Sequence, residues 1–222
     1  MKGRGKMRAA IRIWKETFHI LKRHPKIIIP FALVGILNSA LLYLLYLAPQ
    51  RPVSTLLAPP IKVFFGEKFL HYPFHLYLLP RIFYYAHIFV IATAGILMTG
   101  LAIGMLKDAI LYKKAAIFSN LLMSLKQYLA LLGIWAIEFL IYVFLGKAGH
   151  FIKLSGNISV VIPYLVSILI QLIFVYAMPA VIIEKKNIFS SIKKSFSLLK
   201  KFFLPTMHLI MAPAILYLPI IV

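Results

Sequence analysis

One acidic residue of this chain stands in the middle of an apolar run. Glu138 lies in GIWAIEFLIYVF, near the centre of a segment long enough to cross a bilayer. A carboxylate there costs about 2.5–3.5 kcal/mol on insertion scales, so the side chain should face other helices or water. Two readings stay open: a proton or cation site with a histidine as relay, or a protonated Glu138 in a structural hydrogen bond between helices. Polar residues in other apolar runs are its expected partners: Asn38, His87, Gln171 and His208.

No arrangement of residues predicts catalysis. The chain has five acids and no cysteine, which excludes thiolate chemistry, disulfides and Cys-based metal sites. Neither G-x-S-x-G, nor a P-loop, nor G-x-G-x-x-G occurs. His71 and His75 have the i, i+4 spacing of a metal pair, but Pro73 lies between them and no third ligand is evident. We therefore expect no catalytic residues, no metal and no cofactor.

The composition is that of a membrane protein. The chain is 62% hydrophobic and 14% charged, against about 45–50% and about 25% in an ordinary soluble domain. Its apolar runs are continuous and lack the alternation of a membrane β-barrel. The sequence therefore predicts an all-α, polytopic bundle in a single integral membrane domain, residues 1–222. The expected transmembrane helices cover about 27–47, 82–106, 128–145, 158–183 and 203–222.

The basic residues predict the orientation in the membrane. Of 25 Lys and Arg, nineteen lie in 1–26, 107–126 and 184–202, which alternate with the poorer segments 48–81 and 146–157. The positive-inside rule then places the N-terminus in the cytoplasm and the C-terminus outside, in the cell (inner) membrane. The net charge of +20 therefore indicates anionic lipid headgroups as partners, and not nucleic acid.

Three segments that precede apolar runs have the pattern of amphipathic helices on the cytoplasmic surface, at about 7–24, 108–126 and 185–202. In the last, apolar residues such as Phe189 and Phe196 share one face. Its lysines are the expected headgroup contacts: Lys185, Lys186, Lys193, Lys194, Lys200 and Lys201. Aligning Thr17, Ser124 and Ser195 also aligns the apolar positions around them, which suggests an internal repeat. A sixth span would complete the third copy, so we expect either a short variant or a truncated member of a longer class.

Small residues in the second span predict close helix packing. Gly100 and Gly104 form a GxxxG pattern, extended backward by Gly95. Packing within one chain is the simpler explanation. Contact with a second copy, or with other membrane subunits, is the alternative.

The segment from Tyr176 to Lys201, YAMPAVIIEKKNIFSSIKKSFSLLKK, resembles a group of uncharacterised prokaryotic multi-pass membrane proteins. That group includes the membrane domain attached to some glycerophosphoryl diester phosphodiesterases. The residues that carry the resemblance are Pro179, Glu184 and Ser195. It implies a membrane fold of largely unknown function and no hydrolase activity, because the chain has no soluble phosphodiesterase domain.

Two functions follow as hypotheses. The first is a non-enzymatic membrane protein that organises or senses the membrane through basic amphipathic helices bound to anionic lipid. The alternative is a transporter or channel subunit for a small or lipidic substrate, with Glu138 in the bundle. A lipid-modifying enzyme is the least favoured, for want of catalytic residues.

Overall fold

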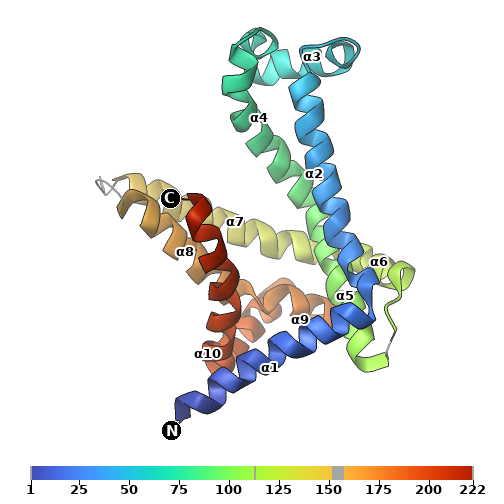
Figure 1. Ribbon diagram of the computed structural model, residues 1–222, viewed down its shortest axis with the longest axis vertical. Helices are drawn as coiled ribbons and strands as arrows, with labels where there is room; N and C mark the ends of the chain where they lie inside the picture. The colour runs from blue at the N-terminus through green and yellow to red at the C-terminus, as the bar shows by residue number, and fades with distance from the viewer. Residues whose placement is uncertain (1, 113, 152–157, 222) are drawn as a thin grey trace. The chain divides into compact units, whose positions relative to one another are not determined.

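The computed structural model describes residues 2–112, 114–151 and 158–221, and these are helical almost throughout, with no strand among them (Figure 1). The first half contains α1 (Lys2–Arg23), η1 (Pro25–Ile28), α2 (Ile29–Leu47), α3 (Val53–Phe65), η2 (Glu67–Leu70), α4 (Phe74–Val90) and the π-helical turn η3 (Ile91–Gly95). The second half contains α5 (Ile96–Tyr112), α6 (Ile117–Lys126), α7 (Tyr128–Phe151), α8 (Ile158–Phe174), α9 (Ala177–Glu184) and α10 (Ile188–Ile221). The predicted all-α class is confirmed.

Four helical segments of the described chain are long and apolar enough to cross a membrane, as a membrane protein requires. They cover Pro25–Leu47, Phe74–Tyr112, Tyr128–Leu145 and Leu165–Glu184. The predicted fifth span, 203–222, is not one of these four. It coincides with the second half of α10, and residue 222 lies outside the described residues.

The chain divides into two compact units, Ile28–Thr99 and Met1–Ile27 with Gly100–Val222. In the first, α2 packs against α4, and the chain between them forms α3 and η2. Phe69 of η2 is fully buried in a core with Leu45, Ile61 and Ile82. The proline-rich segment 48–81 thus packs into an apolar core that it shares with α2 and α4, although α3 contains Pro59 and Pro60.

In the second unit, α10 packs along α8, α9 and α1, and α7 packs along α8. Two prolines explain why its helices are interrupted. Pro179 cannot donate to the carbonyl of Val175, so the chain turns between α8 and α9. Pro205 acts in the same way on α10, which has a kink at Phe202 (φ −118°, ψ 28°).

Two boundaries differ from the predictions. The segment predicted as an interfacial helix from residue 108 begins within α5, which continues to Tyr112, and α6 starts only at Ile117. The sequence KDAILY after Met105 and Leu106 contains no proline or glycine, so nothing ends the spanning helix there. The predicted fourth span, 158–183, is divided into α8 and α9 by the turn before Pro179.

Candidate functional site

Glu138 lines an open cavity of about 360 Å³ between α7 and α8. On α7, the residues that line it follow the spacing of one helical face: Trp135, Glu138, Phe139 and Tyr142. On α8 they are Ser167, Ile170 and Gln171. The cavity therefore combines an acid, a phenol, a hydroxyl and an amide with apolar and aromatic walls.

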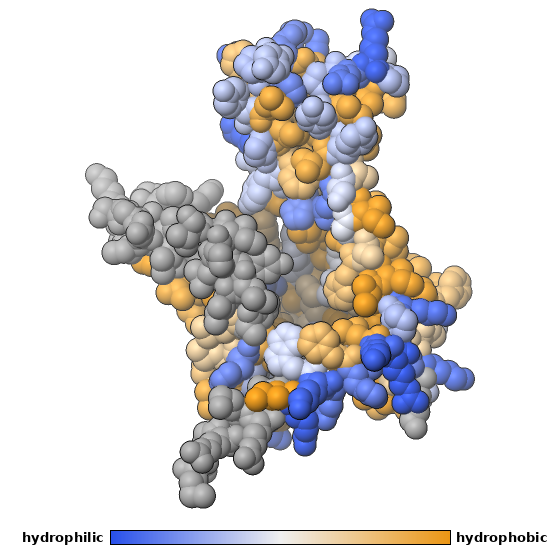
Figure 2. All heavy atoms as spheres, viewed as in Figure 1, coloured by the Kyte–Doolittle hydropathy of each residue, from blue (hydrophilic) through white to orange (hydrophobic). Residues whose placement is uncertain are grey.

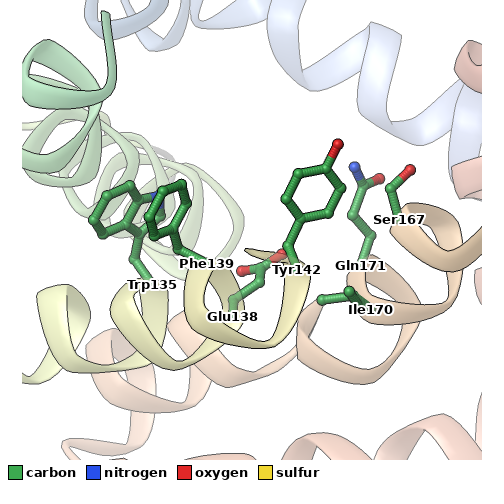
Figure 3. Close-up of a pocket in the computed structure, with 7 residues that line it drawn as sticks. All are labelled: Trp135, Glu138, Phe139, Tyr142, Ser167, Ile170 and Gln171. Carbon is green, nitrogen blue, oxygen red and sulfur yellow. The ribbon is translucent and has the colours of Figure 1, made fainter. Parts of the chain in front are cut away.

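Of the expected partners of Glu138, the cavity includes only Gln171. Figure 3 shows the side chains of Tyr142, Ser167 and Gln171 extending on one side of α7 and α8. The rings of Trp135 and Phe139 stack with centroids 5.2 Å apart, which gives the other end of the cavity an aromatic wall. Such an acid beside hydroxyl and amide groups can hold a proton or accept hydrogen bonds from a cationic ligand.

The other expected partners make hydrogen bonds to groups other than Glu138. Asn38 and His87 belong to the unit Ile28–Thr99, where Asn38 Oδ1 and His87 Nδ1 are 2.7 Å apart. Because an amide oxygen only accepts, the Nδ1 atom of His87 is the donor in this hydrogen bond. His208 lies on α10, and its Nδ1 atom is 2.8 Å from the carbonyl oxygen of Leu204 in the same helix.

Ser195, which is part of the resemblance, bonds to the turn between α8 and α9, three residues before Pro179. The Ser195 hydroxyl is fully buried; it donates to the carbonyl of Ile173 (2.5 Å) and accepts the N–H of Tyr176 (3.2 Å). The turn that Pro179 imposes frees backbone groups inside the protein, where each would be costly without a partner. Ser195 supplies that partner from α10.

Glu184 ends α9 and connects it to α10. Its carboxylate pairs with Lys186 at 2.7 Å and with Lys194 at 3.4 Å. Lys185, which is in the left-handed conformation (φ 51°), caps the C-terminus of α9. Asn187 then caps α10, because its Oδ1 accepts the N–H of Ser190 at 3.0 Å.

The six predicted headgroup lysines therefore have different surroundings. Lys186 and Lys194 are tied to Glu184, whereas Lys200 lies 4.6 Å above the ring of Phe196 and Lys201 lies 5.4 Å from that of Phe202. Lys185 and Lys193 are exposed and take part in no ion pair among the described residues.

Burial follows the alignment of the predicted repeat. Ser124 and Ser195 are both fully buried, and Thr17 is half-buried. The apolar residues aligned beside them are exposed in all three copies: Phe18, Leu125 and Phe196, and likewise Ile11, Phe118 and Phe189. Helices α6 and α10 also begin at aligned positions, Ile117 and Ile188. Helices α6 and α10 thus bury a hydroxyl group at the aligned position, and all three segments expose apolar residues beside it.

Two of the three glycines in the predicted packing motif lie where no larger side chain fits. A Cβ atom on Gly100 would overlap the Ser124 hydroxyl, and one on Gly104 would overlap the amide of Asn120. Both glycines therefore serve close packing of α5 on α6 within one chain. A Cβ on Gly95 would meet only ordinary contacts in its own helix.

Several residues of these sites were not singled out from the sequence. Tyr142 could have been found from its i+4 spacing to Glu138, and Ser167 from its spacing to Gln171. Tyr176, which contacts Ser195, gave no signal, since hydroxyl groups in apolar helices are common and only the packing shows which of them meet.

His71 and His75 are not part of a larger group of potential metal ligands among the described residues. No group of three or more potential metal-binding side chains occurs among the described residues. The ring of His75 instead lies near those of Tyr46 and Tyr72, with centroids 6.2 and 6.1 Å away.

No family model, curated protein or solved structure matches this chain. The resemblance carried by Pro179, Glu184 and Ser195 therefore remains a prediction.

Proposed function

We propose that this protein is a non-catalytic membrane protein that gathers anionic lipid at its cytoplasmic surface, in the inner cell membrane, through the basic and apolar faces of α1, α6 and the first half of α10. Its N-terminus would lie in the cytoplasm, because the positive-inside rule places the segments 1–26, 107–126 and 184–202, with nineteen of the 25 Lys and Arg, on that side. Organising or sensing the inner leaflet is the function that such contacts serve.

One observation carries the proposal. The aligned aromatic and aliphatic residues of the three segments are exposed beside lysines and arginines, with Phe18 at 63%, Phe118 at 74% and Phe189 at 81%. Along α1, hydrophilic and hydrophobic side chains lie next to each other on the surface (Figure 2). Exposed rings among cations are unfavourable in water, whereas the headgroup region accommodates both.

The test uses the full chain reconstituted with spin-labelled lipids. Electron paramagnetic resonance of the motionally restricted component gives the relative association of phosphatidylglycerol and phosphatidylcholine with the protein. We expect a preference for phosphatidylglycerol that weakens with added salt. Replacing Lys193, Lys200 and Lys201 by Gln should reduce it, by about 1 kcal/mol per residue at most.

The matched control removes lysines from the other predicted side. Lys62→Gln with Lys68→Gln should leave the preference unchanged when the anionic lipid is confined to the leaflet that contacts α10. Equal association of both lipids with the wild-type protein would refute the proposal.

A second candidate is supported by the cavity between α7 and α8. Glu138 shares it with Tyr142, Ser167 and Gln171 within segments able to cross a membrane, an arrangement typical of proton or cation pathways. In this alternative the protein is a transporter or channel subunit for a small or lipidic substrate.

The alternative predicts a proton or cation flux through reconstituted protein that is lost in Glu138→Gln. Gln keeps the shape of the side chain and removes its ability to ionise. Glu67→Gln, the same substitution outside the cavity and outside the four spans, is the matched control and should retain flux. Flux that is the same in Glu138→Gln and in the wild type would exclude Glu138 as its site.

A further inference from the structure

A second cavity, of about 550 Å³, lies between the C-terminal half of α1 and α5. Its basic wall comes from α1: Lys15, His19 and Arg23 repeat every four residues, and His24 follows. Side chains at this spacing share one helical face over about 12 Å, which is enough for a headgroup. None of these residues belongs to the headgroup lysines of α10.

The other wall is apolar. Ile20 of α1 and Ala109 and Ile110 of α5 line it, and Ile110 is 58% exposed. A cavity with cationic side chains on one wall and aliphatic ones on the other fits a ligand that is itself an anion joined to hydrocarbon.

The charges of the cavity are available to such a ligand. The acid that lines it, Glu16, is paired with Arg12 at 3.4 Å. Lys15 and Arg23 take part in none of the ion pairs found in the described part of the chain. The C-terminal end of a helix carries a partial negative charge, so the side chains, and not the backbone, must attract an anion here.

We infer that this cavity, defined by Lys15, His19 and Arg23 with Ile20 and Ile110, is a discrete binding site for the phosphate group of a membrane lipid. Arg and Lys make charge-assisted hydrogen bonds to phosphate oxygens, and imidazole N–H groups add neutral donors. The inference deepens the proposed function and rests on it: α1 must lie at a membrane surface for a lipid to enter. It adds one saturable site to a surface that otherwise contacts lipid diffusely.

Native mass spectrometry of the full chain, released from phosphatidylcholine nanodiscs that contain a minor fraction of phosphatidylglycerol, tests the site. We expect one phosphatidylglycerol to be retained per chain. Lys15→Gln with Arg23→Gln should weaken its retention about fivefold for each charge removed. The swap Lys15→Arg with Arg23→Lys keeps both charges and should keep the lipid, which also controls for folding.

The outcomes separate this inference from the proposed function. If the double Gln variant of α1 retains the lipid as the wild type does, the cavity is not the site, even where loss of Lys193 and Lys200 lowers overall lipid association. If the α1 variant loses the lipid while the α10 lysines have no effect, the cavity stands and the broader proposal fails. Displacement of the lipid by inorganic phosphate at equal concentration would show a site for free phosphate and overturn the lipid assignment.

Discussion

The Tyr176 hydroxyl lies 2.6 Å from the Thr206 hydroxyl. This contact joins the turn between α8 and α9 to the kink of α10. Tyr176 stands in the turn between α8 and α9. Thr206 donates to the carbonyl of Phe202, the residue at the kink of α10 (2.8 Å), which leaves Tyr176 as donor to Thr206. Thr206 is only 2% exposed. Each interruption is thus held in place by the other.

This pair should be coupled energetically. Tyr176→Phe and Thr206→Val each remove the interhelical bond, so the double variant should be less destabilised than the sum of the two. We expect a coupling of about 0.6 kcal/mol, the mean measured for hydrogen bonds between membrane helices, and no more than about 1.7 kcal/mol, the largest value measured. Unfolding of all four proteins in mild detergent measures it. Strict additivity would show that the bond contributes nothing.

Ser195→Ala should destabilise the protein by about 1–3 kcal/mol, because it leaves the Ile173 carbonyl and the Tyr176 N–H without their partner inside the protein. Ser197→Ala, two residues further along α10 and exposed, is the matched control and should change little. Thermal unfolding of the two variants is the measurement. Equal melting temperatures would argue against the role assigned to Ser195.

Gly100→Ala should lower the stability by about 1–3 kcal/mol through overpacking, since its Cβ would overlap the Ser124 hydroxyl and approach Leu131. Gly35→Ala has the opposite expected sign. Nothing lies within 4 Å of its Cβ position, and Ala favours a helix over Gly by about 1 kcal/mol. Chemical denaturation of both variants is the test. Loss of stability in Gly35→Ala with none in Gly100→Ala would contradict both expectations.

Glu67 lies outside the four spans, and the hydrogen bond from Lys62 (2.6 Å) with its positive charge holds the pKa of this carboxyl below its ordinary value. Because the folded-state pKa is lowered, the pair stabilises the fold above the unfolded-state pKa. That contribution is lost as the pH falls through the folded-state value.

Titration of Glu67 by nuclear magnetic resonance measures the effect. The variant Lys62→Gln should raise the pKa of Glu67, and Lys68→Gln, which removes a neighbouring charge that makes no bond to Glu67 in the structure, should change it less. An unchanged pKa in Lys62→Gln would show that the ion pair does not form in solution.

The amino-acid sequence by itself determined the class of this protein. Continuous apolar runs without alternation favour spanning helices, because a bilayer satisfies no backbone group, and the sequence alone places the acid Glu138 inside such a run. Local composition decides these features, so they can be read residue by residue. The division of the predicted span 158–183 before Pro179 came only from the structure.

Only the tertiary structure decided which polar groups meet. The sequence offered Asn38, His87, Gln171 and His208 as partners of Glu138. In the structure Gln171 lines the cavity with Glu138, while Asn38 bonds to His87 and His208 bonds to its own helix. Helix α10 bonds to the end of α8 and to the turn after it through Ser195 and Thr206, not only through its apolar stripe. Which face a helix buries depends on its neighbours. A hydroxyl group can be buried where an interrupted helix leaves a backbone carbonyl free to accept its hydrogen bond. An apolar side chain loses little free energy when it faces lipid instead of protein.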